Sequence, residues 1–186
     1  MEKIFLLHAA AQSGKNTCAD AMKEYYEATY HKRVLVLAFA DYVKFVLDKY
    51  YNTPAERTEE YRTRIQQFAT DQCREKNPYI WVNVVQSLLE VIRDDYDIFI
   101  IPDWRFKNEY TSMSLCFSGN AEVIPVLINR PGIEQVDNMT DKQRSHDSER
   151  NLDNFKNFNY TIINETSQIQ KTIQQLIDMI DEVEND

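Results

Sequence analysis

Residues 3–20, KIFLLHAAAQSGKNTCAD, contain the residue types that bind phosphate groups. An apolar run, Ile4–Leu7, leads into small and polar residues that end in Ser13-Gly14-Lys15-Asn16-Thr17, and a helical stretch follows at once. In such a layout, backbone N–H groups and a helix N-terminus cradle phosphates, and a lysine reaches their outer oxygens. We therefore predict a phosphate-binding loop here. An ordinary connection between a strand and a helix is the alternative.

The match to the usual loop pattern, G-x-x-x-x-G-K-[ST], is incomplete. Counted back from Lys15, the first glycine position holds Ala9, and the hydroxyl position holds Asn16. Gly14 fits the pattern, and it suits a tight turn between a strand and a helix because glycine adopts backbone angles that other residues disfavour. The residues that we expect to contact nucleotide phosphates are Ala11, Gln12, Ser13, Gly14, Lys15 and Thr17.

Composition narrows the class of protein. The chain has 186 residues and a formal net charge of -9, which argues against a general surface for nucleic acid polymers or anionic membranes. Its three cysteines lie far apart without metal-ligand spacing, so we predict neither a disulfide framework nor a zinc site, and we expect a cytoplasmic protein, in the host cytoplasm if it is viral. No apolar run approaches about 18 residues, so we expect no membrane span. The length predicts a single domain over residues 1–186.

Short apolar runs alternate with stretches of helical periodicity. The apolar runs are Ile4–Leu7, Val34–Leu37, Ile98–Ile101, Val123–Ile128 and Thr161–Ile163. Uniformly apolar strands are typical of a sheet that is covered on both faces. The pattern therefore predicts an α/β fold with a five-stranded parallel sheet and helices on both faces. Pro125, inside the fourth run, predicts a bulge or a sheet edge there.

In such a sheet, ligands bind beyond the carboxyl ends of the strands. The second run is followed by Phe39-Ala40-Asp41, with Lys44 one turn later, and the third by PDWRFKNE at 102–109. Asp103 therefore follows a buried strand, where enzymes that transfer phosphoryl groups place the carboxylate that holds or orients magnesium. A helix N-cap is the alternative for Asp103.

Several motifs along the chain occur in an order that matches a known family. They are SGKNT after the first strand, Phe39-Ala40-Asp41, Thr70-Asp71 with Arg74 and Trp81 downstream, PDWRFKNE, Arg130-Pro131-Gly132, and His146-Asp147-Ser148-Glu149. From about residue 3 to 180, the chain resembles the phage-type deoxynucleoside monophosphate kinases of the P-loop kinase superfamily. The resemblance implies a P-loop kinase fold with a small lid and transfer of the ATP γ-phosphoryl group to a deoxynucleoside monophosphate. It also implies Mg²⁺ as cofactor and a homodimer.

Phosphoryl transfer requires positioned cations, because negative charge spreads over the oxygens of the transition state. Lys15 is the first such cation, and the resemblance implies that Arg105 clamps the acceptor phosphate. Arg74 and Arg130 are further candidates for phosphate or base contacts, and a surface ion pair is the alternative for each arginine. The residues that we expect to act in catalysis are Lys15, Asn16, Asp103 and Arg105, with Asn16 and Asp103 as candidate metal ligands.

The resemblance also implies that two polar regions cover the substrates. A helical region at about 45–78 would cover the acceptor, and a lid at about 133–154, with Arg144 and Arg150, would close over the transferring group. A solvated helix face or loop would have the same composition. The residues that we expect to contact the acceptor are Phe39, Asp41, Lys44, Gln66, Asp71, Arg74, Trp104, Glu109 and His146.

Asn16 is the main departure from the family pattern, which usually has an aspartate between the loop lysine and the threonine. Asparagine keeps a carbonyl oxygen but loses the charge, so magnesium affinity or rate should fall unless Asp103 or Asp41 compensates. Two other functions remain open. One is a P-loop kinase of another phosphorylated small molecule, similar to animal-type phosphomevalonate kinase, and the other is a nucleotide-binding protein without catalysis.

Overall fold

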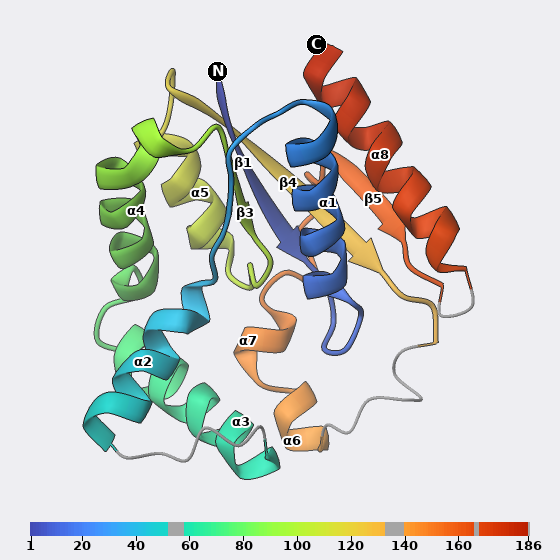
Figure 1. Ribbon diagram of the computed structural model, residues 1–186. Helices are drawn as coiled ribbons and strands as arrows, with labels where there is room; N and C mark the ends of the chain where they lie inside the picture. Colours follow the sequence, from blue (N-terminus) through green and yellow to red (C-terminus); the bar gives the residue numbers. More distant parts are fainter. Residues whose placement is uncertain (52–57, 133–139, 166–167, 186) are drawn as a thin grey trace.

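The chain folds around a parallel sheet. The computed structural model describes residues 1–51, 58–132, 140–165 and 168–185 (Figure 1). Its strands pair in the order β2-β3-β1-β4-β5, and every pairing is parallel. The predicted five-stranded parallel sheet is confirmed. The strands are β1 (Glu2–His8), β2 (Val34–Val36), β3 (Ile98–Ile101), β4 (Ala121–Asn129) and β5 (Tyr160–Ile163).

Helices cover both faces of this sheet, as the apolar runs predict. In Figure 1, α1 and α8 lie on one side of the strands and α4 and α5 on the other, while α2, α3, α6 and α7 lie beneath the strand ends. The α-helices are α1 (Lys15–Thr29), α2 (Phe39–Tyr51), α3 (Glu59–Gln66), α4 (Ile80–Ile92), α5 (Lys107–Cys116), α6 (Asp141–Arg144), α7 (Asp147–Arg150) and α8 (Ile169–Asn185). A π-helix, η1 (Gln67–Arg74), continues α3, and a 3₁₀ turn, η2 (Arg93–Asp95), follows α4.

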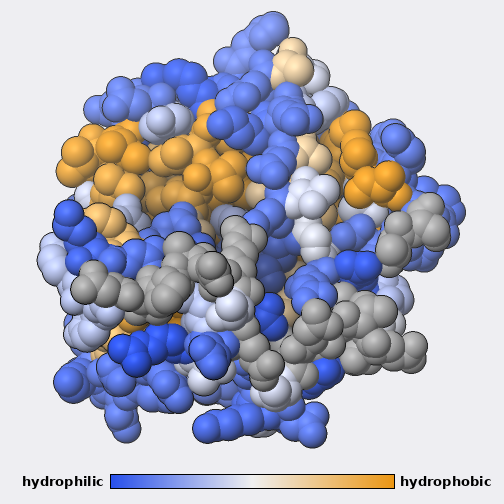
Figure 2. Space-filling model, turned by 60° about the horizontal axis from the view of Figure 1, so that its bottom comes forward, coloured by the Kyte–Doolittle hydropathy of each residue, from blue (hydrophilic) through white to orange (hydrophobic). Residues whose placement is uncertain are grey.

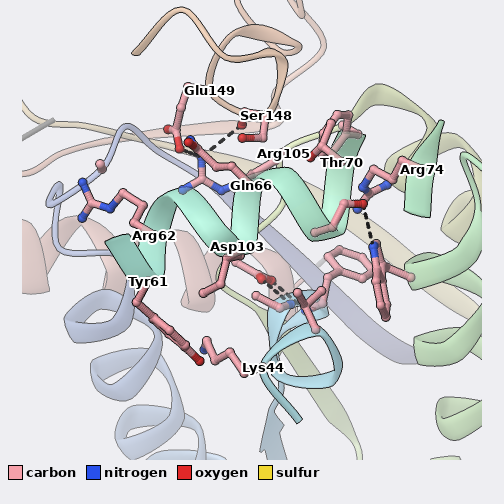
Figure 3. Close-up of a pocket in the computed structure, with 18 of the residues that line it drawn as sticks. Lys44, Tyr61, Arg62, Gln66, Thr70, Arg74, Asp103, Arg105, Ser148 and Glu149 are labelled. Carbon is pink, nitrogen blue, oxygen red and sulfur yellow. Dashed lines mark hydrogen bonds and ion pairs between the residues drawn. The ribbon is translucent and has the colours of Figure 1, made fainter. Parts of the chain in front are cut away.

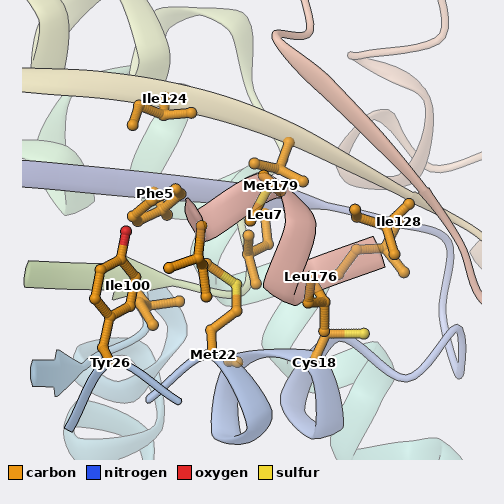
Figure 4. Close-up of a cluster of buried hydrophobic side chains, with 14 of the residues drawn as sticks. Phe5, Leu7, Cys18, Met22, Tyr26, Ile100, Ile124, Ile128, Leu176 and Met179 are labelled. Carbon is orange, nitrogen blue, oxygen red and sulfur yellow. The ribbon is translucent and has the colours of Figure 1, made fainter. Parts of the chain in front are cut away.

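The uniform apolarity of the strands has a direct cause in the packing. Successive side chains of β1 point to opposite faces: Phe5 and Leu7 pack against α1 and α8, and Ile4 and Leu6 face α4 and α5. Figure 4 shows the first cluster, with Met22 of α1 and Met179 of α8 meeting the strands. Each large side chain buried in this way contributes about 1.5–3 kcal/mol to stability, so both faces of the sheet hold the helices in place.

Pro125 lies inside an interior strand with an unbroken register, so neither the predicted bulge nor the predicted sheet edge is present. It pairs in register with Leu6 of β1. Its carbonyl accepts a hydrogen bond from Asn159 N at 2.9 Å, and β5 begins only at Tyr160. In a parallel ladder the N–H and C=O of one residue point to the same neighbour. The missing N–H of Pro125 therefore faces the region before β5 begins, and no ladder bond of β5 is lost.

The carboxyl ends of the strands point toward α2, α3, α6 and α7, which form the lower edge of the molecule in Figure 1. Residues 52–57 of the predicted acceptor-covering region and 133–139 of the predicted lid lie outside the described residues. Thr58 caps α3 by accepting from Tyr61 N at 3.1 Å, and Thr140 caps α6 by accepting from Gln143 N at 3.3 Å. No described helix meets the length and apolarity that a membrane span requires.

Candidate active site

The loop between β1 and α1 has the geometry of an anion-binding turn. Gly14 is the N-cap residue of α1 and has a φ of 82°, and Gln12 has a φ of 59°. A Cβ on Gly14 would lie closer to Asn164 Nδ2 than real Cβ contacts allow. Glycine is therefore required here by backbone angle and by space. The first N–H groups of α1, from Lys15 onward, have no partner inside the helix and are available to an anion.

Side chains from three parts of the chain bind the carbonyl groups of this loop. Lys15 Nζ donates to Ala9 O at 2.8 Å and to Ala10 O at 3.1 Å. Arg130, which follows β4, donates from Nη1 to Gln12 O at 2.6 Å. Asn164, which follows β5, donates from Nδ2 to Ser13 O at 2.8 Å. Arg130 therefore contacts the loop itself in this structure, where the sequence analysis predicts a contact with substrate phosphate or base.

Lys15 is held in an environment that disfavours its charge. Burial, and after it the positive charge of Arg105, lowers the pKa of Lys15 from its usual range to about 7. Both residues line the same cavity. An anion between them would be attracted by both cations and would raise the pKa of Lys15 again.

A cavity of about 550 Å³ lies at the carboxyl edge of the sheet, between the loop that joins β1 to α1, α2, α3 with η1, the segment after β3, and α7. All four residues predicted to act in catalysis line it: Lys15, Asn16, Asp103 and Arg105. Figure 3 shows Asp103 and Arg105 on opposite sides of the helix formed by α3 and η1 in that view. In Figure 2, which turns this edge forward, hydrophilic residues dominate the lower half of the face.

Asp103 caps a helix, and the helix is α2. Its two carboxylate oxygens accept from Phe39 N at 2.9 Å and Ala40 N at 2.8 Å, and the dashed lines in Figure 3 mark these bonds. Burial raises the pKa of Asp103, although the two backbone donors oppose that rise. The capping alternative is thus what the structure contains. Because Asp103 also lines the cavity, its carboxylate can still contribute charge there.

Arg105 points to α7. It forms an ion pair with Glu149, and its Nη1 donates to Ser148 O at 3.0 Å. Ser148 and Glu149 line the cavity beside it, as Figure 3 shows. The guanidinium therefore faces the cavity with a carboxylate of the chain as its partner.

Arg74 and Glu109, both predicted to contact the acceptor, form a buried ion pair with each other. The guanidinium carbon of Arg74 lies 4.0 Å from the centre of the Phe106 ring. Glu109 Oε2 accepts from Arg105 N and Phe106 N, each at 3.0 Å. Both residues line the cavity. In this structure the pair holds the backbone that carries Arg105, and the surface ion pair considered for Arg74 is in fact buried.

Besides Arg74 and Glu109, three more predicted acceptor contacts line the cavity: Phe39, Lys44 and Gln66. Trp104 does not, and its predicted substrate contact is wrong. Its side chain is fully buried, its Nε1 donates to Phe106 O at 2.8 Å, and its ring packs against Phe155 and Phe158. An indole with every face covered cannot stack on a base.

The other predicted contacts lie around the cavity and, within the described part of the chain, do not form its wall. Asp41 accepts from Ala38 N at 3.0 Å and pairs with Lys44. His146 Nε2 lies 3.2 Å from Asp71 Oδ1, which joins the start of α7 to η1. Thr17 is exposed in the first turn of α1. Arg150 pairs with Asp153 at the surface, and Arg144 ends α6 without lining the cavity.

Asn164 and Glu149 are two residues whose contacts at the site the sequence analysis missed. Asn164 directly follows the fifth apolar run, so the rule that ligand sites form beyond strand ends would have drawn attention to it. Its amide is buried, and its Oδ1 accepts from Thr172 Oγ1 of α8 at 3.2 Å. Glu149 lies in a polar region, and no local pattern indicates its pairing with Arg105.

By sequence, the chain matches no protein-family model and no curated protein. In three dimensions it is similar to the APS kinase of Mycobacterium tuberculosis, solved with AMPPNP and APS (TM-score 0.54, 12% identity, 97% of this chain and 98% of that chain). It is also similar to a sugar kinase from Janibacter sp. (0.55, 10%, 97% and 95%) and to a putative kinase from Chloroflexus aurantiacus (0.52, 10%, 95% and 97%). At these identities the likeness concerns the fold. The chain therefore has the fold of the P-loop kinases, as its sequence predicts.

Proposed function

We propose that the chain is a deoxynucleoside monophosphate kinase, which transfers the γ-phosphoryl group of ATP to a deoxynucleoside monophosphate and releases ADP. The observation that carries the proposal is one cavity lined both by Lys15, at the start of α1, and by Arg105. Lys15 and the start of α1 suit the phosphates of a donor, and the guanidinium suits an acceptor that is itself a phosphate. A neutral hydroxyl acceptor would not require the second cation.

The proposed chemistry depends on charge and position. An oxygen of the acceptor phosphate forms a bond to the γ-phosphorus, while the bond from that phosphorus to the bridging β-phosphate oxygen breaks. A phosphate monoester has a second pKa near 6, so the attacking oxygen is already ionised at neutral pH and no strong base is needed. Lys15 and Arg105 stabilise the charge that spreads over the transferring group. Residues of α7 cover this region and limit access of water.

Mg²⁺, when bound, would neutralise charge on the donor phosphates. Among the described residues, no group of three His, Cys, Asp or Glu side chains could hold a metal ion. Mg²⁺ is usually bound through one or two carboxylates, several waters and the substrate's phosphates. Asn16 and Asp103 line the cavity with one amide and one carboxylate group. We propose them as its protein partners, with Asp103 already engaged by two backbone N–H groups.

The acceptor half of the cavity supports a nucleotide base. The cavity lining includes the aromatic side chains of Phe39, Trp81 and Phe106 and the polar side chains of Gln66 and Thr70. Apolar walls with a few positioned polar groups are typical of sites for flat heterocycles. We therefore propose that α2, α3 and η1 cover the acceptor base, that α6 and α7 form the lid, and that the enzyme is a homodimer.

The test is an assay of ADP release with ATP and Mg²⁺ against a panel of deoxynucleoside and ribonucleoside monophosphates. Lys15→Ala and Arg105→Gln should each abolish turnover, while Glu27→Gln, a change on the surface of α1, should not. Turnover with a phosphorylated acceptor other than a nucleotide would favour the phosphomevalonate-kinase-like alternative. ATP binding without turnover of any acceptor would favour a non-catalytic protein.

A further inference from the structure

The guanidinium of Arg105 is already paired with a carboxylate of the same chain. Its partner is Glu149 of α7, whose carboxylate forms an ion pair with the guanidinium, and Ser148 O accepts from Nη1 at 3.0 Å. The Arg105 side chain is 28% exposed and that of Glu149 is 13% exposed. The pair is thus partly removed from water and stronger than one at the surface, where salt bridges contribute about 0–1 kcal/mol.

Contacts elsewhere hold α6 and α7 in the position that forms this pair. Gln143 Nε2 donates to Thr63 Oγ1 at 3.0 Å, and His146 Nε2 lies 3.2 Å from Asp71 Oδ1. These bonds join α6 to α3 and the start of α7 to η1. Glu149 therefore lies against Arg105 because α7 rests on the helices that cover the acceptor half of the cavity.

A carboxylate and a phosphate compete for the same guanidinium. Both accept two parallel N–H···O bonds from arginine. Glu149 and Arg105 both line the cavity. Glu149 and Ser148 O both contact Arg105 through Nη1, so a phosphate that includes Nη1 in its fork must displace Glu149. A phosphate dianion carries the greater charge and can do so, whereas a neutral hydroxyl cannot.

We propose that Glu149 is an internal anion that occupies the acceptor-phosphate position on Arg105 until a phosphorylated acceptor displaces it. The inference rests on the proposed function, because it takes Arg105 as the clamp of the acceptor phosphate. Glu149 then determines specificity. Acceptors that carry a phosphate release α7 from Arg105. Acceptors without a phosphate leave the ion pair intact, so Arg105 stays bound to Glu149.

The test compares binding of inorganic phosphate to the full chain and to Glu149→Gln by titration calorimetry. Glutamine keeps the size of the side chain and removes its charge. We expect the dissociation constant of phosphate to fall about fivefold, the equivalent of losing a competing pair worth about 1 kcal/mol. Asp147→Asn removes the same charge from the same helix at an exposed position beside Asn151, and it should change phosphate affinity by less than about twofold, as expected for a surface charge.

The double variant Arg105→Gln, Glu149→Gln assigns any gain to the guanidinium, because phosphate bound at the loop of Lys15 would be unaffected. The inference is overturned if Glu149→Gln binds phosphate no more tightly than the unchanged chain, if neither binds it, or if the double variant keeps the gain. Nucleotide turnover without a gain in Glu149→Gln would sustain the proposed function and reject this inference. Tighter phosphate binding by Glu149→Gln without nucleotide turnover would sustain this inference and reject the nucleotide as the acceptor.

Discussion

Gly14→Ala is the substitution whose effect the structure defines best. Alanine at a φ of 82° costs about 1–2 kcal/mol because its Cβ approaches the neighbouring carbonyl oxygen. The new Cβ would also collide with Asn164 Nδ2, which donates to Ser13 O at 2.8 Å. Loss of that hydrogen bond adds about 1 kcal/mol. We therefore expect the free energy of unfolding to fall by about 2–3 kcal/mol.

Gly119→Ala is the matched control. Gly119 has the same φ of 82°, but a Cβ there meets nothing within 4 Å. Gly119→Ala should lower the free energy of unfolding only by the cost of the backbone conformation, about 1–2 kcal/mol. A chain of this size loses about 2–4 °C in Tm for each kcal/mol, so calorimetric unfolding of the two variants separates the collision from the backbone strain.

AMPPNP binding completes the test. Gly14→Ala should weaken AMPPNP binding about tenfold if about 1.4 kcal/mol of the strain falls on the phosphate loop, and Gly119→Ala should leave it unchanged. Asn164→Ala removes the same hydrogen bond without the strain, so it should weaken binding by less. Equal Tm values and equal AMPPNP affinities for the two alanine variants would refute the role assigned to Asn164 and Gly14.

Three further predictions follow from the charges of the site. ATP affinity should fall as pH rises from about 7 to about 9, because the free protein loses the Lys15 proton above its pKa of about 7 while bound phosphate favours the charged form. Titration calorimetry should show no dependence of ATP affinity on pH for Lys15→Ala. The same lack of dependence in the unchanged chain would contradict the role given to Lys15. Asn16→Asp should raise kcat/KM or leave it unchanged, and a loss of more than about tenfold, about 1.4 kcal/mol, would show that Asn16 has a task that a carboxylate cannot perform. Glu109→Gln should lower the free energy of unfolding by about 3–5 kcal/mol, since it leaves Arg74 buried without a charged partner. Chemical denaturation measures this loss, with Asp153→Asn as the surface control. Equal stability of the two variants would show that the buried pair contributes little.

The sequence predicts the parts of the fold that depend on local patterns. Ile98–Ile101 is a strand with the predicted bounds because all four side chains are buried, a condition that a four-residue apolar run expresses directly. Lys15, Asn16, Asp103 and Arg105 meet at one cavity because each follows a strand of a parallel sheet, and parallel strands end at the same edge. Topology alone therefore brings together residues that lie far apart in the chain.

Side-chain contacts between distant segments of the chain could not be predicted from the sequence. Trp104 has the residue type of a base-stacking side chain, but Phe155 and Phe158, which follow α7, enclose its ring. Arg74 has the residue type of a phosphate ligand, but Glu109 neutralises it in the core. Neither partner lies near in sequence, so no local pattern distinguishes a ligand-binding side chain from one that is already satisfied.

Partners within the chain also stabilise the charged side chains of the candidate site when no ligand is bound. Lys15 donates to loop carbonyls, Asp103 accepts two backbone N–H groups, and Arg105 pairs with Glu149. A charge left without such a partner in a partly buried cavity would cost several kcal/mol. Under the proposed function, substrate binding at this site is an exchange of partners. The pair of Arg105 with Glu149 is then the resting contact that an acceptor phosphate replaces.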